Sequence, residues 1–249
     1  MQRYFIEVAY NGTQYSGFQV QENATTIQGA IEGALSIFFR TPIQLTGSSR
    51  TDAGVHALQN YFHTDTSLVL QQRHVYHLNA LLPADIVIKT IAPVPADAHC
   101  RFDAIYRAYK YYIITSKSPF HNQTAWLYPY TVNIAALNEA AQVLTQYTDF
   151  TTFSKKHTQV NNFHCNLLHS EWTMVNNSLV YSVSGNRFLR GMVRGLVGTM
   201  LQVGRGKISV QQFCNIIEAK DCQKADFSTP AKGLFLEQVV YPQGYFLRH

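Results

Sequence analysis

Residues 164–184 read HCNLLHSEWTMVNNSLVYSVS, and the pattern of this stretch indicates the fold class. Two runs rich in β-prone side chains, 164–175 and 179–184, flank the turn-forming pair Asn176-Asn177. Strand patterns joined by such a short turn predict neighbouring antiparallel strands. A doubly wound parallel fold would instead separate its strands by crossover helices.

The segments on either side of this hairpin alternate between strand and helix patterns. The predicted fold class is therefore α+β, with mainly antiparallel sheet and helices packed on it. The elements divide into two similar subdomains, residues 1–103 and residues 104–249. The expected helices are 27–39, 68–81, 134–145, 188–203 and 210–219; the expected strands include 4–10, 85–92, 107–115 and 234–241, and 58–62 is a strand or a short helix.

The net charge of +5 is unevenly distributed along the chain. Residues 1–103 hold six Lys and Arg against eight Asp and Glu, whereas residues 104–249 hold fourteen against seven. A basic second half favours a polyanionic partner such as nucleic acid. A protein whose surface is merely basic is the alternative that charge alone leaves open.

Cysteine usage indicates a reduced compartment, and hydropathy indicates the absence of a membrane segment. The four cysteines form no CxxC pair, and such scattered thiols are typical of cytosolic proteins. The N-terminus lacks the long uncharged segment of a signal peptide, and no run reaches the roughly 18 apolar residues needed to cross a bilayer. We therefore expect a cytoplasmic protein without a membrane segment.

The loop-forming stretch 47–54 contains the first candidate for chemistry, Asp52, with Arg50 before it and Gly54 after it. A guanidinium close to a carboxyl group favours the ionised form of that group. A glycine allows a ligand to approach the backbone closely. The structural alternative is a turn, since an aspartate in a loop commonly caps neighbouring backbone groups.

The predicted helix that begins near residue 187 combines arginines with a broad apolar side. At about 100° per residue, Arg187, Arg190 and Arg194 share one face. Such a stripe suits phosphate contacts or a carboxylate partner, and a solvated charged face is the structural alternative. Glycines on an adjoining stripe each cost about 1 kcal/mol of helix propensity, so we expect a closely packed neighbour there.

The predicted strand 107–115 begins with RAYKY. Because side chains alternate along a strand, Arg107, Tyr109 and Tyr111 lie on one face and Lys110 lies on the other. Aromatic rings beside cations suit base stacking combined with phosphate contact. Tyrosines that fill a core and leave their hydroxyls at the surface are the structural alternative.

Ten histidines raise the question of a metal site. His74 and His77 have helical spacing, and His56 and His63 are near neighbours, but no HExxH motif, CxxC motif or clustered carboxylate set accompanies them. We therefore expect histidines satisfied by the fold and no metal ligands. The sequence holds no P-loop and no GxGxxG motif, so a nucleotide cofactor has no support.

In their order along the chain, these motifs resemble the tRNA pseudouridine synthase A family. The most specific part of the resemblance is RTDAGVHA, residues 50–57. Asn11 stands where the family usually has aspartate, and Arg187 stands where a small residue is common. The other matching segments are 10–21, 27–32, 81–86, 101–102, 107–111, 188–198 and 233–242.

This resemblance implies an enzyme that converts uridine to pseudouridine at positions 38 to 40 in the anticodon stem-loop of tRNA. It also implies a homodimer of two-subdomain chains with an active cleft between the subdomains. By residue match, Asp52 is the nucleophile, Tyr109 packs against the target base and Arg194 pairs with Asp52. The expected substrate-binding residues are Tyr109, Arg50, Arg107, Lys110, Arg187 and Arg190.

The chemistry of this reaction requires no cofactor, because the base only exchanges its N1 bond to ribose for a C5 bond. Two functions from other classes remain as alternatives. A non-catalytic RNA-binding module would share the basic half and the aromatics, but it would not need the RTDAG loop. A metal-dependent hydrolase would lose its activity in the presence of a chelator.

Overall fold

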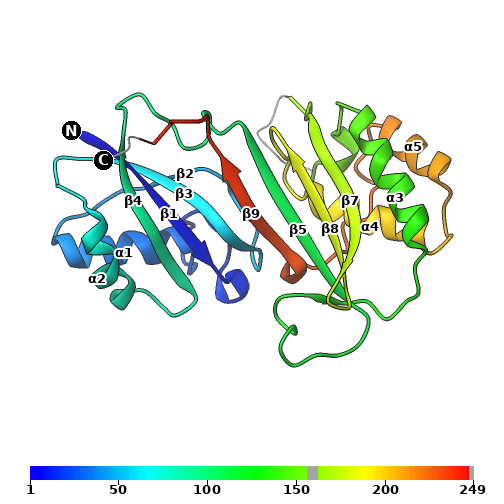
Figure 1. Cartoon of the computed structure of the whole chain (residues 1–249), viewed down its shortest axis with the longest axis horizontal. Coiled ribbons are helices and arrows are strands. Elements are labelled where there is room, and N and C mark those ends of the chain that lie inside the picture. Colours follow the sequence, from blue (N-terminus) through cyan, green and yellow to red (C-terminus); the bar gives the residue numbers. More distant parts are fainter. Residues whose placement is uncertain (156–161, 247–249) are drawn as a thin grey trace. The chain divides into compact units, whose positions relative to one another are not determined.

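The computed structural model describes residues 1–155 and 162–246, and these divide into two compact units (Figure 1). Unit 1 comprises Met1–Ile105 and the segment that begins at Leu236, and unit 2 comprises Tyr106–Phe235. The mixture of helices and mainly antiparallel strands confirms the predicted α+β class. Within the two described ranges, every helix is too short or too polar to span a bilayer.

Unit 1 is built on an antiparallel sheet whose central strand is β1 (Gln2–Tyr10). This strand pairs with β3 (His56–Thr66) on one side and with β4 (Ile86–Val94) on the other. The short strand β2 (Thr46–Gly47) pairs with β3. Helices α1 (Ile27–Phe39) and α2 (Val75–Leu81) lie together against this sheet, and α2 contacts β4 (Figure 1).

An aromatic cluster shows why the end of the chain belongs to unit 1. The rings of Phe5, Tyr61 and Tyr241 lie with centroids 5.2–6.3 Å apart, and the Tyr241 hydroxyl donates to the Cys100 carbonyl at 2.5 Å. Strand β9 (Leu234–Val240) carries the chain into this cluster, and it lies next to β3 in the sheet order. The predicted subdomain of residues 104–249 is therefore corrected at its C-terminal end, because the chain from Leu236 onward packs with unit 1.

Unit 2 has an antiparallel sheet in the order β5-β8-β7 with helices packed against it (Figure 1). The predicted hairpin is confirmed, since Asn176 and Asn177 join β7 and β8 with the positive φ values of 47° and 62° that such a turn requires. Helix α3 packs on β7 and α4, and α5 contacts both helices. The elements are β5 (Tyr106–Ile114), β6 (Trp126–Leu127), α3 (Ile134–Val143), β7 (Leu167–Val175), β8 (Ser178–Gly185), α4 (Met192–Gly204) and α5 (Val210–Glu218).

Two helices are shorter than predicted. Helix α2 begins at Val75 rather than near residue 68, because the Thr66 hydroxyl accepts from the Leu68 amide and a single 3-10 turn follows at Gln72–His74. Helix α4 begins at Met192, because Gly191 has a φ of +75°, which a right-handed helix excludes. The short α2 leaves unit 1 unchanged, but the late start of α4 changes the arginine pattern.

The predicted helical stripe of three arginines is wrong. Arg187 and Arg190 precede Gly191 and lie in the connection between β8 and α4, so Arg194 alone of the three lies on the helix. The expected close packing of the glycines is confirmed. A Cβ atom at Gly195 would lie 2.8 Å from the Phe227 ring, so Phe227 packs this closely on α4 because residue 195 has no side chain.

Candidate active site

Asp52 lies in unit 1 on a loop, residues 48–55, that connects β2 to β3; we call it the Asp52 loop. Asn60, buried on β3, holds this loop by its amide. Its Oδ1 accepts from the Ser49 N–H at 3.3 Å, and its Nδ2 donates to the Ser49 carbonyl at 2.8 Å. The Asn60 side chain thus satisfies both backbone groups of Ser49, as a neighbouring strand would.

Tyr10 provides a second support for the Asp52 loop. Its hydroxyl accepts from Asn60 Nδ2 at 3.1 Å and shares a hydrogen bond of 2.9 Å with the Thr51 hydroxyl. The Phe18 N–H donates to the Thr51 carbonyl at 3.1 Å. Thr51, the neighbour of Asp52, is therefore bonded through both its side chain and its backbone.

Glycine allows a third support, in which two backbone segments touch. A Cβ atom at Gly12 would lie 2.0 Å from the Val55 carbonyl oxygen, so no other residue fits at this position. The Gly12 N–H donates to Nδ1 of the buried His56 at 3.1 Å. The Val55 N–H in turn donates to the Asp52 carbonyl at 3.1 Å, which closes the turn. The half-buried Asp52 side chain therefore projects from a loop that is fixed on both sides.

Arg50 precedes Thr51 at the start of the Asp52 loop. It is exposed, and it lines a pocket beside the Asp52 loop together with Arg101 and Phe102. The sequence suggested that Arg50 holds the Asp52 carboxyl ionised, and this remains a prediction. Its place in the pocket wall is compatible with its other predicted role, contact with substrate, which also remains a prediction.

In unit 2, the β8–α4 connection, residues 186–191, packs against two predicted site residues of β5, Arg107 and Tyr109. Arg107 is buried on β5, and its Nη1 donates to the Asn186 carbonyl at 2.9 Å. The Tyr109 ring meets the Phe188 ring edge-on, with centroids 4.9 Å apart and an interplanar angle of 75°. The connection thus lies against the face of β5 that carries Arg107 and Tyr109.

Arg194 is held in unit 2 by the backbone that precedes β9. Its Nε donates to the Thr229 carbonyl at 2.7 Å, and the Tyr111 hydroxyl donates to the next carbonyl, Pro230, at 2.7 Å. Burial raises the pKa of Tyr111 far above its usual value, and the nearby charge of Arg194 opposes that rise. Arg194 and Tyr111 therefore lie close together, with one edge of the guanidinium already engaged.

The other predicted cations of unit 2 lie on separate segments and do not form one stripe. Arg187 is half-buried near Cys165; burial raises the pKa of that thiol to about 11, and the Arg187 charge opposes the rise. Arg190 is exposed, and its carbonyl accepts from the Lys155 N–H at 3.1 Å. Lys110 is half-buried on β5, where strand alternation places it opposite Arg107 and Tyr109.

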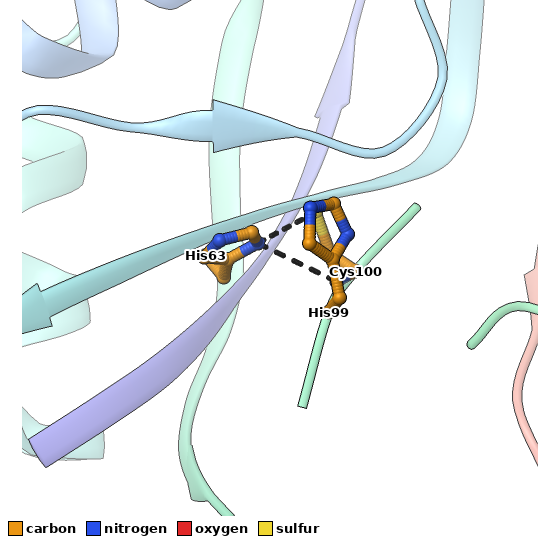
Figure 2. Close-up of side chains that lie close together, drawn as sticks. All are labelled: His63, His99 and Cys100. Atoms are coloured by element: carbon orange, nitrogen blue, oxygen red, sulfur yellow. Dashed lines mark hydrogen bonds between the residues drawn. The ribbon is translucent and has the colours of Figure 1, made fainter. Parts of the chain in front are cut away.

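His63, His99 and Cys100 form a cluster of possible metal ligands in unit 1, with ligand atoms within 4.8 Å of one another (Figure 2). Nδ1 of His63 lies 3.1 Å from the Cys100 sulfur and accepts from the Cys100 N–H at 3.4 Å. The thiol also contacts the Thr46 carbonyl at 3.2 Å, and Nδ1 of His99 accepts from the Arg101 N–H at 3.1 Å. Because each group has a protein partner and a structural zinc site uses four ligands, we interpret the cluster as a support for the chain around Cys100.

Comparison with known proteins now identifies the family. A family model described as tRNA pseudouridine synthase matches residues 6–103 and 140–242. A protein of Parabacteroides distasonis named tRNA pseudouridine synthase A is 45% identical over 252 residues, which cover 99% of this chain and 98% of that protein. The chain belongs to the tRNA pseudouridine synthase A family. Proteins of the same name from Bacteroides thetaiotaomicron and from Staphylococcus aureus (strain Newman) are 45% and 34% identical, each over 99% of this chain and 93% of their own length.

Membership of the tRNA pseudouridine synthase A family makes this chain an enzyme of the isomerase class. The matched segments contain Asp52 and Arg194, whereas β5 with Arg107, Tyr109 and Lys110 lies between them.

Sequence reasoning missed the residues that support the site in this synthase A family member. Asn60 stands in no motif, and Tyr10 opens the matching segment 10–21 without any sign of its contact with the Asp52 loop. The pairing of β1 with β3 brings both residues to that loop. Phe188 was noted for its place in a matching segment but not for its contact with Tyr109. Its single signal was its position beside Arg187 in that segment.

Proposed function

We propose that this enzyme converts uridine to pseudouridine at positions 38 to 40 in the anticodon stem-loop of tRNA, with the Asp52 carboxylate as nucleophile. The observation that carries this proposal is the half-buried Asp52 on a loop fixed by Asn60, Tyr10 and Gly12. The names of the relatives supply the substrate class, since they are called tRNA pseudouridine synthase A.

A fixed carboxylate suits the chemistry of this isomerisation. The bond between ribose C1′ and base N1 breaks, and C1′ then bonds to C5 of the same base; C5 loses a proton and N1 gains one. The reaction is an isomerisation with no net gain or loss of atoms or electrons, and the proton that leaves C5 is exchanged with water. A carboxylate can bond to the substrate and later depart, which divides one difficult step into two easier ones. Holding it in place lowers the entropic cost of reaching the reacting atom.

Arg194 and Tyr109 supply the two other roles in this proposal. The guanidinium of Arg194 pairs with Asp52 and offsets the cost of keeping a carboxylate ionised in a dry site. Tyr109 stacks on the target base and returns about 1–3 kcal/mol of the energy spent in unstacking it. Phe188 supports this role, because its edge-on contact fixes the plane of the Tyr109 ring. The active cleft between the subdomains stays a prediction of the family resemblance.

The remaining cations are proposed to bind the phosphate backbone of the RNA. They are Arg50, Arg107, Lys110, Arg187 and Arg190, and each phosphate that they neutralise makes binding more sensitive to salt. The excess of Lys and Arg in residues 104–249 supports this assignment. We also propose a homodimer, on the family resemblance; sedimentation at micromolar concentration tests it, and a single species of 28.2 kDa overturns it.

The test compares Asp52→Asn with the unchanged enzyme on tRNA labelled with tritium at uridine C5. We expect the variant to bind tRNA with unchanged affinity and to release no tritium, because the amide cannot act as the nucleophile. Asp97→Asn is the matched control, since Asp97 is an exposed carboxylate in the same unit, and it should keep full activity.

Two outcomes would overturn parts of this proposal. Substantial tritium release by Asp52→Asn would remove the nucleophile assignment. Tight tRNA binding by the unchanged chain without any tritium release would favour the alternative of a non-catalytic RNA-binding module.

A further inference from the structure

A pocket with a volume of about 370 Å³ opens in unit 1 beside the Asp52 loop. The side chains of Arg50, Arg101 and Phe102 form part of its wall. Among the described residues that line it, none is a carboxylate, so the wall combines positive charge with an aromatic ring.

Phe102 is the feature of this pocket that packing within unit 1 does not explain. Its exposed fraction is 74%, which is high for a phenyl ring. The His99 ring lies beside it with centroids 4.2 Å apart, and the Arg101 guanidinium carbon lies 5.8 Å from its centroid. An exposed aromatic ring beside cations is the arrangement with which proteins stack the bases of single-stranded nucleic acid.

The turn that presents Arg101 and Phe102 is fixed from within. Nδ1 of His99 accepts from the Arg101 N–H at 3.1 Å and from the Phe102 N–H at 3.4 Å, and the Asp103 carboxylate accepts from the His99 N–H at 2.7 Å. Burial lowers the pKa of His99, so the ring is neutral at pH 7 and keeps the lone pair that both amides need. Phe102 is therefore exposed on an ordered turn.

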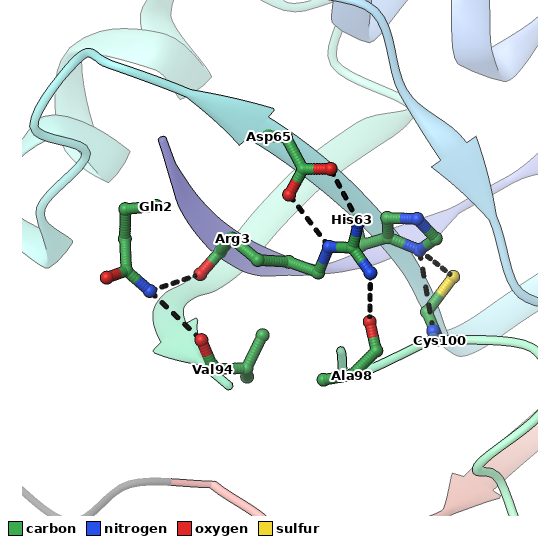
Figure 3. A network of polar contacts seen from close by, with 7 residues as sticks. All are labelled: Gln2, Arg3, His63, Asp65, Val94, Ala98 and Cys100. Atoms are coloured by element: carbon green, nitrogen blue, oxygen red, sulfur yellow. Dashed lines mark hydrogen bonds and ion pairs between the residues drawn. The ribbon is translucent and has the colours of Figure 1, made fainter. Parts of the chain in front are cut away.

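A polar network also holds the chain just before this turn, at Ala98 and Cys100 (Figure 3). Arg3 donates to the Ala98 carbonyl at 2.8 Å and to the Asp65 carboxylate at 2.7 Å and 2.5 Å. His63 contacts both the thiol and the amide of Cys100, the residue before Arg101. Because the turn is already ordered, a ligand that binds it does not have to supply the ordering energy.

The distance to Asp52 restricts what this pocket can hold. Thr51 alone separates Arg50 from Asp52, so their Cα atoms are at most about 7.6 Å apart. We propose that the pocket binds the RNA nucleotide next to the target uridine, with its base on the Phe102 ring and its phosphate at Arg50 and Arg101. This inference rests on the proposed function and adds a second nucleotide site to it.

The experiment is a double-mutant cycle that combines a change in the protein with a change in a hairpin RNA. The hairpin has the sequence of an anticodon stem-loop. An abasic nucleotide is placed at each position around the target in turn, and the Kd is measured by filter binding in the Asp52→Asn background, where no turnover occurs. We expect Phe102→Ala to weaken binding of the intact hairpin about tenfold, as the loss of one stacked base predicts. We also expect one abasic position to weaken binding of the Phe102 chain by the same factor and to have no effect on Phe102→Ala.

Two variants serve as controls. Phe102→Trp keeps a stacking surface and should restore binding. Tyr76→Ala removes another exposed ring of unit 1, 79% exposed on α2 and outside the pocket, and should leave the Kd unchanged. Thermal unfolding shows whether each variant is folded; Phe102 is exposed, so we expect no change.

The pocket assignment is overturned if Phe102→Ala binds the intact hairpin as tightly as the Phe102 chain. It is also overturned if every abasic position weakens the two proteins equally. These outcomes are separate from failure of the proposed function, because the Kd cycle needs no product. Conversely, an unchanged enzyme that makes no pseudouridine would refute the activity whatever the Kd cycle shows.

Discussion

The Asp52 loop of unit 1 and the β8–α4 connection of unit 2 each carry two of the eight predicted site residues, but the protein holds the two segments in different ways. In the Asp52 loop, buried side chains and a glycine contact fix the backbone around one carboxylate. In the connection, hydrogen bonds to backbone carbonyls fix the chain. The Asn186 carbonyl accepts from the Arg107 side chain, and the Arg190 carbonyl accepts from the Lys155 N–H.

This difference matches what the proposed role of each segment requires. A nucleophile loses rate when it is displaced by a fraction of an ångström, whereas a cation that attracts phosphate acts over a longer distance. We therefore expect changes that loosen the Asp52 loop to reduce stability and kcat. Changes to exposed cations of the connection should instead weaken RNA binding and its dependence on salt.

The largest effect should come from Arg194→Ala, which asks whether unit 2 also contributes to the chemical step. Loss of a charged donor at a site of developing charge lowers kcat by about 10²–10³-fold. Single-turnover kinetics at saturating tRNA measure this directly. Arg205→Ala is the matched control, since Arg205 follows the same helix and stacks on Tyr130 at 3.9 Å, and it should retain kcat. Normal chemistry in Arg194→Ala would remove Arg194 from the proposed catalytic residues.

Gly12→Ala should have the next largest effect, on the stability of unit 1. The added Cβ atom meets the Val55 carbonyl at 2.0 Å, and this backbone atom can move only if the Asp52 loop moves. We expect a loss of about 3 kcal/mol in the free energy of unfolding. Urea unfolding measures it. Gly33→Ala is the control, because nothing lies within 4 Å of the added atom on α1, and it should be neutral or stabilising.

Asn60→Ala tests whether the loop must be held by its buried amide. The change leaves both backbone groups of Ser49 without this partner, so we expect a loss of about 2 kcal/mol together with a reduced kcat. Asn79→Ala provides a matched comparison, since Asn79 makes two similar bonds to the Ile88 backbone away from the loop. It should lose similar stability and keep its kcat. Equal kcat values for the two variants would separate loop support from catalysis.

The smallest expected effects are on the pH dependence of stability, which should differ between unit 1 and unit 2. Burial lowers the pKa of His63 to about 4, so an unfolded chain takes up this proton below pH 6.5 while the folded unit 1 does not. Protonation of His63 in the unfolded chain therefore does not reduce the free energy of unfolding above pH 6.5. As the pH falls from 6.5 towards 4, it reduces that free energy by at most about 1.4 kcal/mol per pH unit. Urea unfolding between pH 7 and 5 should show a steeper loss for the unchanged chain than for His63→Gln. Parallel curves would mean that His63 titrates alike in both states.

Unit 2 should respond at lower pH. Although burial opposes the shift, bonds from Lys220 and Thr151 lower the pKa of Asp149 to about 2 from the ordinary 3.8. The stability that this carboxylate adds is present above pH 3.8 and is lost as the pH falls through 2. Asp149→Asn should therefore flatten only the acidic end of the unfolding profile.

The sequence predicted the fold class and most helices and strands, because their residues follow regular hydrophobic patterns. The late start of α4 could not be read from the sequence, since Gly191 is compatible with a helix and its φ of +75° is set by its surroundings. The return of the chain from Leu236 to unit 1 also escaped prediction. It depends on contacts between Tyr241 and residues more than a hundred positions earlier.

For the site, the sequence offered the residues that carry chemistry but not those that hold them. Asp52 and Arg194 stand in motifs whose spacing is distinctive. Asn60 and Tyr10 meet the Asp52 loop only through strand pairing, and such register is not visible in one sequence. The pocket around Phe102 likewise depends on segments that are far apart along the chain.

The late entry of β9 into unit 1 has a consequence for synthesis. Because a chain emerges from the ribosome with its N-terminus first, nearly all of the unit that carries Asp52 is made early and then waits for Leu236 and the residues after it. Until then β3 lacks one neighbour and exposes an open strand edge. The unit that is begun first is thus completed last, and a chain that stops before Leu236 would leave unit 1 without its final strand.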